Sequence, residues 1–187
     1  MNKLILIIGP TAVGKTSILN ELMKTNRYDR LITCTTREPR EGEVNGSDYH
    51  FLKKETFEEG IKDNLFVEHA NVHGNLYGIN SELLQNQLSG DKDVLAIVDH
   101  QGASTLKDLL RDNCKVLFIE PNNKKDIIER LAARGDEEED TRKRLVSYSL
   151  EIQTKNNWDY LLTNENNKFA DCVKSIENYL SNQNVKA

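Results

Sequence analysis

The sequence predicts an α/β fold in which helices cover a parallel β-sheet, and three observations predict it. Short apolar runs alternate with longer segments of helical periodicity, which is the pattern of repeated β–α–β units. The runs at 94–98 and 116–119 are rich in β-branched residues, as expected of strands that are covered on both faces. A glycine-containing loop, GPTAVGKTS at 9–17, connects the first apolar run to the first helical segment.

The elements are expected in the following order. The apolar run at 3–8 forms a strand that ends at Gly9, and KTSILNELMK at 15–24 forms a helix with its apolar residues on one face. A second strand is expected at 30–34, before a segment at 35–50 that is rich in charge and contains an Asn-Gly turn signal. Later strands are expected at 94–98, 116–119 and 158–162, and later helices at 101–111, 123–133, 141–156 and 168–181.

Composition limits the kinds of partner. The formal net charge is -5, whereas a sequence-independent nucleic-acid binder normally carries a basic excess. The three cysteines are widely spaced and form no CxxC pair, so neither a disulfide framework nor a zinc site is indicated. The first apolar run is too short for a signal peptide or a membrane span. We expect a cytoplasmic protein without nucleic-acid or membrane partners; the oligomeric state, monomer or homodimer, stays open.

The loop at 9–17 matches the phosphate-binding pattern GxxxxGK[ST]. Its glycines let successive backbone N–H groups point at phosphate oxygens, and the helix that follows adds the positive end of its dipole. Lys15 is expected to contact the β- and γ-phosphates of ATP, and the Thr16 hydroxyl is expected to bind Mg²⁺, partly through water. The motif predicts the three-layer P-loop NTPase fold and binding of ATP or GTP; with ATP as the nucleotide, the expected binding residues are Gly9, Pro10, Thr11, Ala12, Val13, Gly14, Lys15, Thr16 and Ser17. Alone it also fits a small-molecule kinase, a nucleotide kinase or a tRNA-modifying prenyltransferase.

A second phosphate site is indicated by TTREPREGEVNGSDYHF at 35–51. Arg37 and Arg40 are three residues apart, with Pro39 stiffening the chain between them. Guanidinium groups match the oxygens of a phosphate monoester in a bidentate way, and Tyr49 adds a neutral donor. The alternative for such a segment is a solvated charged loop.

From Leu4 to about Tyr179 the sequence resembles the guanylate kinase family. The resemblance includes the P-loop, TTREPREGE with NGSDYHF, FVEHANVHGNLYG, VDHQGA, RLAARG with KRL, and WDYLLTN, in the order of the family. It implies an ATP:GMP phosphotransferase that uses Mg²⁺. Several of these motifs are long, so the match is more specific than a P-loop alone.

The resemblance also implies a GMP site. A carboxylate accepts both the N1–H and the 2-amino group of guanine, and Glu68 matches the carboxylate with this role. Thr33 matches the position that contacts guanine O6, and Asp99 is expected to contact guanine or water around Mg²⁺. Glu43 is expected to support the arginines or a water-bridged contact. The implied GMP-binding residues are Thr33, Arg37, Arg40, Glu43, Tyr49, Glu68, Tyr77 and Asp99.

The segment RLAARGDEEEDTRKRL at 130–145 is rich in arginine. Its structural alternative is a pair of solvated helices with i,i+4 ion pairs. The resemblance implies that Arg130, Arg134 and Arg144 close over the phosphates and act with Lys15 as the catalytic groups, although the segment between Arg134 and Arg144 is one residue shorter than usual. Asn164 matches a residue near the adenine of ATP.

Two residues depart from the family pattern. Ile97 stands where the family carries an acid, and Ile79 stands where it carries a hydroxyl. Three functions therefore compete: an active guanylate kinase, a P-loop kinase with an altered or broader acceptor, and a non-catalytic binding module on the same fold. The retained P-loop and lid arginines argue against the module. The expected organisation is a single domain, 1–187, with a core at 1–33, 90–133 and 144–187, a GMP-binding lobe at 34–89 and a lid at 134–143.

Overall fold

A computed structural model describes residues 2–72, 74–135 and 137–184. The chain forms two compact units. The first unit contains the chain up to Leu6 and Arg27–Lys115, and the second contains Ile7–Asn26 and the chain from Val116 onward. Each unit is described by itself. The expected division into core, GMP-binding lobe and lid stays a prediction.

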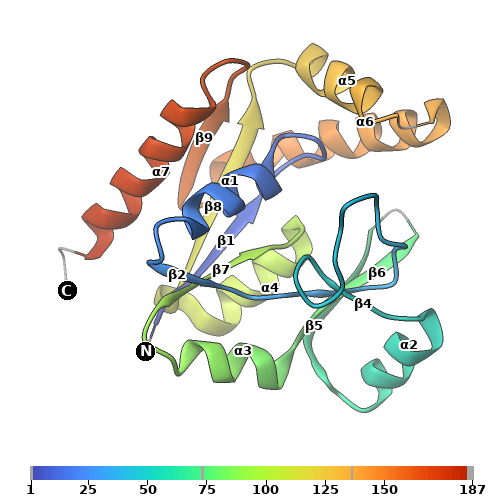
Figure 1. Cartoon of the computed structure of the whole chain (residues 1–187), viewed down its shortest axis with the longest axis vertical. Coiled ribbons are helices and arrows are strands. Elements are labelled where there is room, and N and C mark those ends of the chain that lie inside the picture. Colours follow the sequence, from blue (N-terminus) through green and yellow to red (C-terminus); the bar gives the residue numbers. More distant parts are fainter. Residues whose placement is uncertain (1, 73, 136, 185–187) are drawn as a thin grey trace. The chain divides into compact units, whose positions relative to one another are not determined.

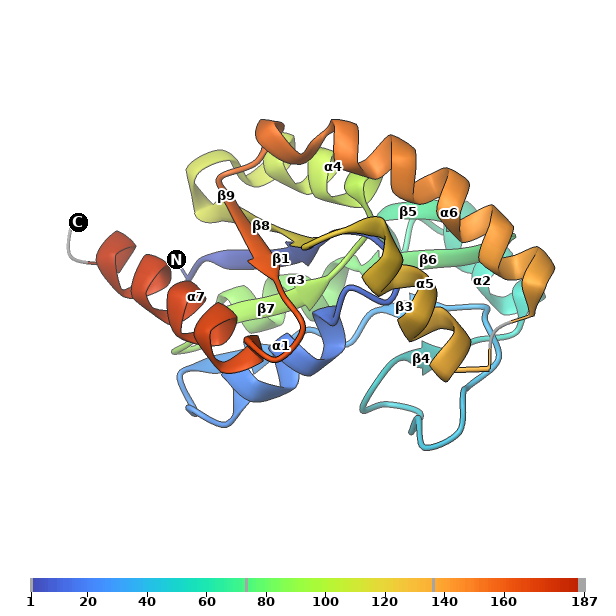
Figure 2. The ribbon, with the colours of Figure 1, turned by 90° about the horizontal axis from the view of Figure 1, so that it is seen from above.

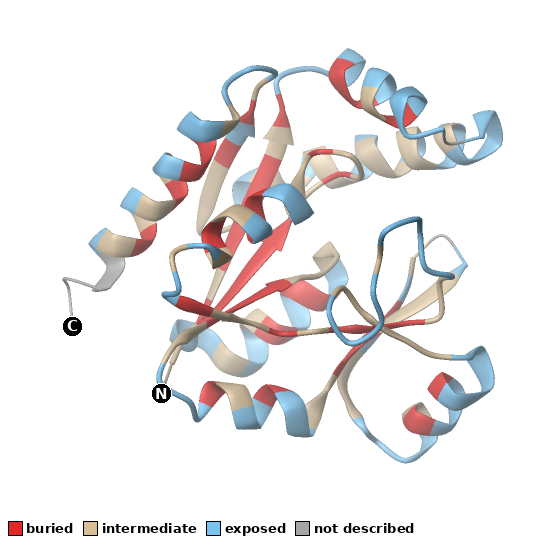
Figure 3. Cartoon of the chain, viewed as in Figure 1, coloured by how far each residue is buried: buried red, intermediate tan, exposed pale blue. Residues whose placement is uncertain are grey.

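The main sheet has five strands in the order β2-β7-β1-β8-β9. These strands are β1 (Leu4–Ile8), β2 (Tyr28–Arg30), β7 (Asp93–Ile97), β8 (Cys114–Pro121) and β9 (Tyr160–Asn164). β2 pairs in parallel with β7, and β8 pairs in parallel with β9. Every residue of β1 is buried (Figure 3), as expected of a short apolar strand covered on both faces. The predicted α/β fold is confirmed.

The second unit carries four helices: α1 (Lys15–Met23), α5 (Lys124–Ala133), α6 (Glu138–Gln153) and α7 (Phe169–Asn184). A short 3₁₀ turn, η2 (Lys155–Asn157), leads from α6 toward β9. α7 lies along β9 and contacts α1 (Figures 1 and 2). The rings of Tyr160 on β9 and Tyr179 on α7 stack with their centroids 4.0 Å apart, and this contact helps to hold α7 against β9.

The first unit contains a second sheet, in the order β4-β3-β6-β5. Its strands are β3 (Cys34–Thr35), β4 (His50–Phe51), β5 (Phe66–Val72) and β6 (Asn75–Asn80). β6 is antiparallel to both β3 and β5. The unit also contains α2 (Lys54–Lys62), α3 (Ser81–Leu88), α4 (His100–Leu110) and the 3₁₀ turn η1 (Arg111–Asn113). α4 packs beside β5.

The strand predicted at 30–34 is wrong as a single element. The backbone N–H of Leu31 donates to the carbonyl oxygen of Leu95 in β7 of the main sheet. The carbonyl oxygen of Thr33 instead accepts from the N–H of His50 in β4 of the second sheet. The chain thus changes partners between the two sheets, and β2 and β3 are separate strands. A run of residues with uniform β propensity carries no signal for such a change of partner.

Other element boundaries moved by a few residues, and two helices were not predicted. The last strand begins at Tyr160 rather than at residue 158, and the Asp159 carboxylate just before it accepts from Val116 N, on β8, at 2.8 Å. The helix expected at 141–156 begins at Glu138, inside the expected lid. The unpredicted helices are α2 and α3. In α2 the buried residues are Phe57 and Gly60, so its apolar face is narrow.

Candidate active site

The P-loop lies in the second unit, between the end of β1 and the start of α1. Gly9 has φ of 134°, and a Cβ atom there would lie 2.1 Å from the carbonyl oxygen of Ile119. Gly14 has φ of 100° and is the N-cap of α1. Both positions therefore require glycine. The first N–H groups of α1 have no partner within the helix, so this end of the loop is suited to an anion.

Lys15 is the first residue of α1, and its ammonium group folds back on the loop. It donates to the carbonyl oxygens of Gly9 and Pro10, the second at 2.9 Å. These contacts hold the charge of the side chain inside the loop that the motif assigns to phosphate. An incoming phosphate would offer the ammonium group stronger, ionic acceptors than the two neutral carbonyls.

Arg130, near the end of α5, also contacts this loop. Its guanidinium group donates to the carbonyl oxygens of Ala12 at 3.3 Å and Val13 at 3.2 Å. It also donates to Asn164 O at 3.2 Å and to the side chain of Asn166 at 2.7 Å. One side chain thus connects the P-loop to the turn after β9, and it brings positive charge to the phosphate end of the loop.

Asn164 is the last residue of β9, and it is 5% exposed. Its side-chain amide donates to the Val13 carbonyl at 2.8 Å. A Cβ atom on Gly14 would lie 2.6 Å from the same amide nitrogen, so a side chain there would displace the amide group from this position. The structure therefore places Asn164 against the P-loop backbone; the expected contact with adenine stays a prediction.

The other expected ATP-side residues differ in their surroundings. Arg144 on α6 donates to the Thr11 hydroxyl at 3.1 Å. Arg134 is exposed at the C-cap of α5, and Thr16 and Ser17 are exposed in the first turn of α1. Among residues 2–72, 74–135 and 137–184, no cluster of three or more His, Cys, Asp and Glu side chains is arranged to hold a metal ion. The hydroxyl oxygen of Thr16 is a type of donor that suits Mg²⁺, which is commonly held by few protein oxygens together with substrate phosphates and water.

The expected phosphate site for the acceptor lies in the first unit and is organised by Glu43. One carboxylate oxygen pairs with the Arg37 guanidinium at 2.8 Å, and the other accepts from Arg40 N at 2.7 Å. Burial by itself raises the pKa of Glu43. Its bonds to Arg37 and to the Arg40 backbone lower the pKa, and together they outweigh burial, so the net pKa lies below the usual value. Glu43 therefore remains ionised and holds Arg37 in place.

Aromatic rings surround the same guanidinium. The Arg37 Cζ atom lies 5.5 Å from the ring centroid of Tyr49 and 5.8 Å from that of Phe51. Tyr49 and Tyr77 meet edge to face, with their centroids 6.1 Å apart. Burial raises the pKa of Tyr49, so its hydroxyl stays protonated and available as a donor. The structure thus brings Arg37, Glu43, Tyr49 and Tyr77 into one cluster.

Glu68 lies on β5 beside the first turn of α4. Burial, and then the negative charge of Asp99, raise the pKa of Glu68 to about 7. Asp99 is the N-cap of α4, and its Oδ1 accepts from Gly102 N at 2.7 Å. Asp99 and Glu68 are therefore neighbours across this helix end. Thr33 is 6% exposed in the segment just before β3.

Sequence analysis missed some residues that contact these groups. Asn166 binds Arg130, and Phe51 lies beside Arg37. Phe51 lies in NGSDYHF, which the resemblance includes, and Asn166 lies two residues after WDYLLTN, so proximity to Tyr49 and Asn164 was the available signal. The buried cysteines Cys34, Cys114 and Cys172 are free thiols.

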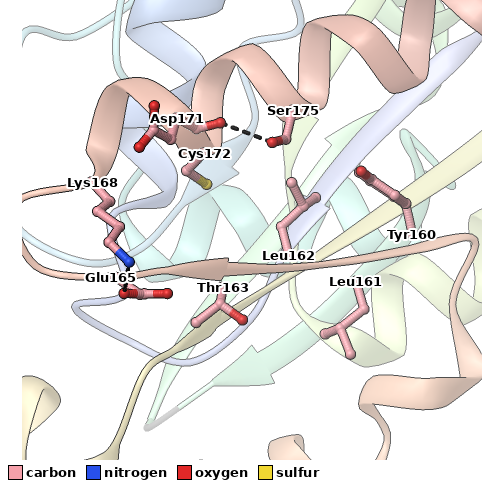
Figure 4. Close-up of a pocket in the computed structure, with 9 residues that line it drawn as sticks. All are labelled: Tyr160, Leu161, Leu162, Thr163, Glu165, Lys168, Asp171, Cys172 and Ser175. Carbon is pink, nitrogen blue, oxygen red and sulfur yellow. Dashed lines mark hydrogen bonds and ion pairs between the residues drawn. The ribbon is translucent and has the colours of Figure 1, made fainter.

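A separate pocket of about 260 Å³ lies in the second unit, between β9 and α7 (Figure 4). An ion pair between Glu165 and Lys168, at 2.8 Å, lies at one end of it. The described residues that line the pocket include none of those expected to bind nucleotide.

None of the described helices is long and apolar enough to cross a membrane.

The P-loop geometry and its arginine define a P-loop nucleotide-binding protein, and comparison with known proteins gives the family. The guanylate kinase family model matches residues 1–183. Guanylate kinase from Clostridium tetani is 36% identical over 179 residues, which cover 95% of this chain and 85% of that protein. Guanylate kinase from Prochlorococcus marinus is 38% identical over 166 residues, which cover 88% and 90% of the two chains.

A solved structure agrees with the sequence relatives. The crystal structure of guanylate kinase from Anaplasma phagocytophilum superposes with a TM-score of 0.80 at 25% identity, covering 100% of this chain and 88% of that chain. The chain belongs to the guanylate kinase family.

Proposed function

We propose that this protein transfers the γ-phosphoryl group of Mg²⁺-bound ATP to GMP, giving ADP and GDP. The observation that carries the proposal is the cluster around Arg37, which Glu43 and two tyrosines hold together. A P-loop alone implies only a nucleoside triphosphate. A second, separate anion site with neutral hydroxyl donors supplies what a nucleoside monophosphate acceptor requires.

In this proposal the P-loop N–H groups and Lys15 hold the β- and γ-phosphates of ATP. Bound Mg²⁺, with the Thr16 hydroxyl as a ligand, supplies neutralisation of phosphate charge. Arg130, Arg134 and Arg144 add positive charge as negative charge develops on the transferring group. Lys15 would exchange its bonds to the carbonyls of Gly9 and Pro10 for bonds to the phosphates.

On the acceptor side, Arg37, Arg40, Tyr49 and Tyr77 orient the GMP phosphate for attack. That phosphate is already ionised at neutral pH, so the mechanism needs no general base. Catalysis then depends on alignment and on exclusion of water, which would otherwise accept the phosphoryl group. Glu68, with support from Thr33 and Asp99, selects guanine through its paired N1–H and 2-amino donors.

A kinase with a different acceptor is the competing proposal, and one observation favours it. Ile79, which replaces the usual hydroxyl, is 1% exposed and lies directly opposite Glu68 on β6. An aliphatic side chain cannot form the hydrogen bond of a hydroxyl, so the base contact is altered at this point. The free, buried thiols fit a cytoplasmic location for either kinase.

A coupled assay of ADP release tests the proposal. The purified chain is given Mg²⁺ and ATP with GMP, dGMP, AMP, CMP or UMP in turn. Turnover with a guanine nucleotide alone is the expected result. Turnover with a different base would favour the altered-acceptor kinase, and a lack of turnover with all five would favour a non-catalytic binding module.

A further inference from the structure

Gly102 occupies a position where a helix would ordinarily gain from a side chain. It lies in the first turn of α4 and is buried. Glycine is a poorer helix former than alanine, because it loses more backbone entropy on folding. Its φ angle is not in the positive range that would favour glycine. Helix geometry alone therefore gives no reason for glycine at this position.

The neighbourhood of Gly102 supplies the reason. A Cβ atom at this position would lie 2.8 Å from Glu68 Oε2, 3.0 Å from its Cδ and 3.2 Å from its Oε1. All three of the nearest atoms thus belong to one carboxyl group. Because this group is the end of a flexible side chain, an added methyl group would displace the carboxyl group rather than the helix.

We propose that Gly102 is a positioning residue for base selection, whose missing side chain leaves the space in which the Glu68 carboxylate meets guanine. The inference rests on the proposed function and names a residue that sets its specificity. The backbone N–H of Gly102 also donates to Asp99 Oδ1 at 2.7 Å. Gly102 therefore positions both acids at this helix end. It holds Asp99 by a hydrogen bond, and its lack of a side chain leaves room for the Glu68 carboxylate.

Ile79 increases the dependence on this space. It pairs with Glu68 across β5 and β6, and directly paired residues of antiparallel strands point to the same side of the sheet. With an aliphatic side chain as its cross-strand neighbour, Glu68 gains no hydroxyl partner there. The free space beside Gly102 becomes correspondingly more important for the position of the carboxylate.

The variant Gly102→Ala tests the inference, with Ser104→Ala on the exposed face of the same helix as its control. The measurements are KM for GMP, KM for ATP, the ratio of kcat/KM for GMP and IMP, and the unfolding midpoint in urea. IMP lacks the 2-amino group, so the ratio reports on the carboxylate contact. We expect KM for GMP to rise roughly tenfold, as when a hydrogen bond to a charged group is lost. The preference for GMP over IMP should fall, KM for ATP should stay as in the wild type, and the unfolding midpoint should not fall, because alanine is the better helix former.

A purely structural role for Gly102 gives a different pattern. Alanine would then leave the ratio of kcat/KM for GMP and IMP as in the wild type, whatever its effect on stability, and this outcome would overturn the inference. Loss of folding in Gly102→Ala would also overturn it, because the methyl group would then meet something less yielding than a side-chain end. Failure of the wild type to phosphorylate GMP would instead count against the proposed function itself.

A double-mutant cycle shows whether Gly102 acts through Glu68. In a Glu68→Ala background the carboxyl group that the methyl group would displace is gone. We therefore expect Gly102→Ala to have no further effect on GMP binding in that background, measured as Kd by calorimetry. Equal effects of Gly102→Ala in the two backgrounds would show that the residue acts by another route and would overturn the inference.

Discussion

The side-chain amide of Asn164 donates a hydrogen bond to the backbone carbonyl oxygen of Val13, with 2.8 Å between the two atoms. This bond joins the end of β9 to the middle of the P-loop, and it is buried. Through this bond Asn164, which is far from the P-loop in sequence, helps to hold the loop in its conformation. The conformation of the P-loop thus depends on more than its own glycines.

We expect Asn164→Ala to lower the unfolding free energy by about 0.5–1.5 kcal/mol, because it removes a buried hydrogen bond while the Val13 carbonyl keeps its bond from Arg130. KM for ATP should rise, since the P-loop loses a support, while KM for GMP stays near the wild-type value. Urea unfolding and steady-state kinetics measure the two effects. Thr163→Ala, at the exposed neighbouring position, is the control. Equal behaviour of the two variants would contradict the role given to Asn164.

Lys15→Met should abolish turnover and preserve the fold. The methionine side chain has similar length but carries no charge for the β- and γ-phosphates. Lys24→Met is the matched control, because Lys24 follows the same helix and its side chain is 71% exposed. Circular dichroism and the ADP-release assay are the measurements. Wild-type turnover in Lys15→Met would refute the proposed mechanism.

Glu43→Ala should raise KM for GMP by roughly tenfold, the scale of one charge-assisted hydrogen bond, because Arg37 loses the carboxylate that orients it. KM for ATP should not change. The control is Glu41→Ala, two residues away and exposed. If Glu41→Ala raised KM for GMP equally, local charge rather than the Arg37–Glu43 pair would be responsible.

The conformation of the loop at 9–17 could be predicted because its sequence signal is local, whereas ATP binding by its residues stays a prediction. The spacing of Gly9, Gly14 and Lys15 in one loop contains the geometry that phosphate requires. The path of 30–35 could not be predicted, since the change from one sheet to the other depends on hydrogen bonds to Leu95 and His50, which are distant in sequence.

Contacts between residues that are distant in sequence could not be predicted from sequence patterns either. Asn164 was expected beside adenine, and only the fold shows its bond to Val13. The place of Gly102 beside Glu68 likewise depends on how α4 packs on β5. The resemblance to the family implied both acids of this site, whereas the type and spacing of the glycine that makes room for one of them gave no signal.

The stability of the wild type should fall, relative to Glu68→Gln, as the pH rises from about 4.5 to above 7. Burial, followed by the charge of Asp99, raises the pKa of Glu68 from 4.5 to about 7. Between these values the folded protein binds a proton that the unfolded chain has lost, so this contribution is present at low pH and disappears as pH passes 7. Urea unfolding of both proteins at several pH values measures the difference. A difference independent of pH would contradict the raised pKa.

The same ionisation should control GMP binding. Guanine donates two hydrogen bonds, so it binds the carboxylate form of Glu68, and affinity should fall by up to about tenfold per pH unit below the pKa of the free protein. The GMP phosphate titrates near pH 6 and contributes its own dependence. Glu68→Gln retains the titration of the phosphate and lacks that of the carboxyl group. We therefore expect the Kd for GMP, measured by calorimetry from pH 5.5 to 8.5, to vary more steeply in the wild type than in Glu68→Gln. Parallel profiles would mean that Glu68 does not titrate on binding, and they would remove it from the guanine contact.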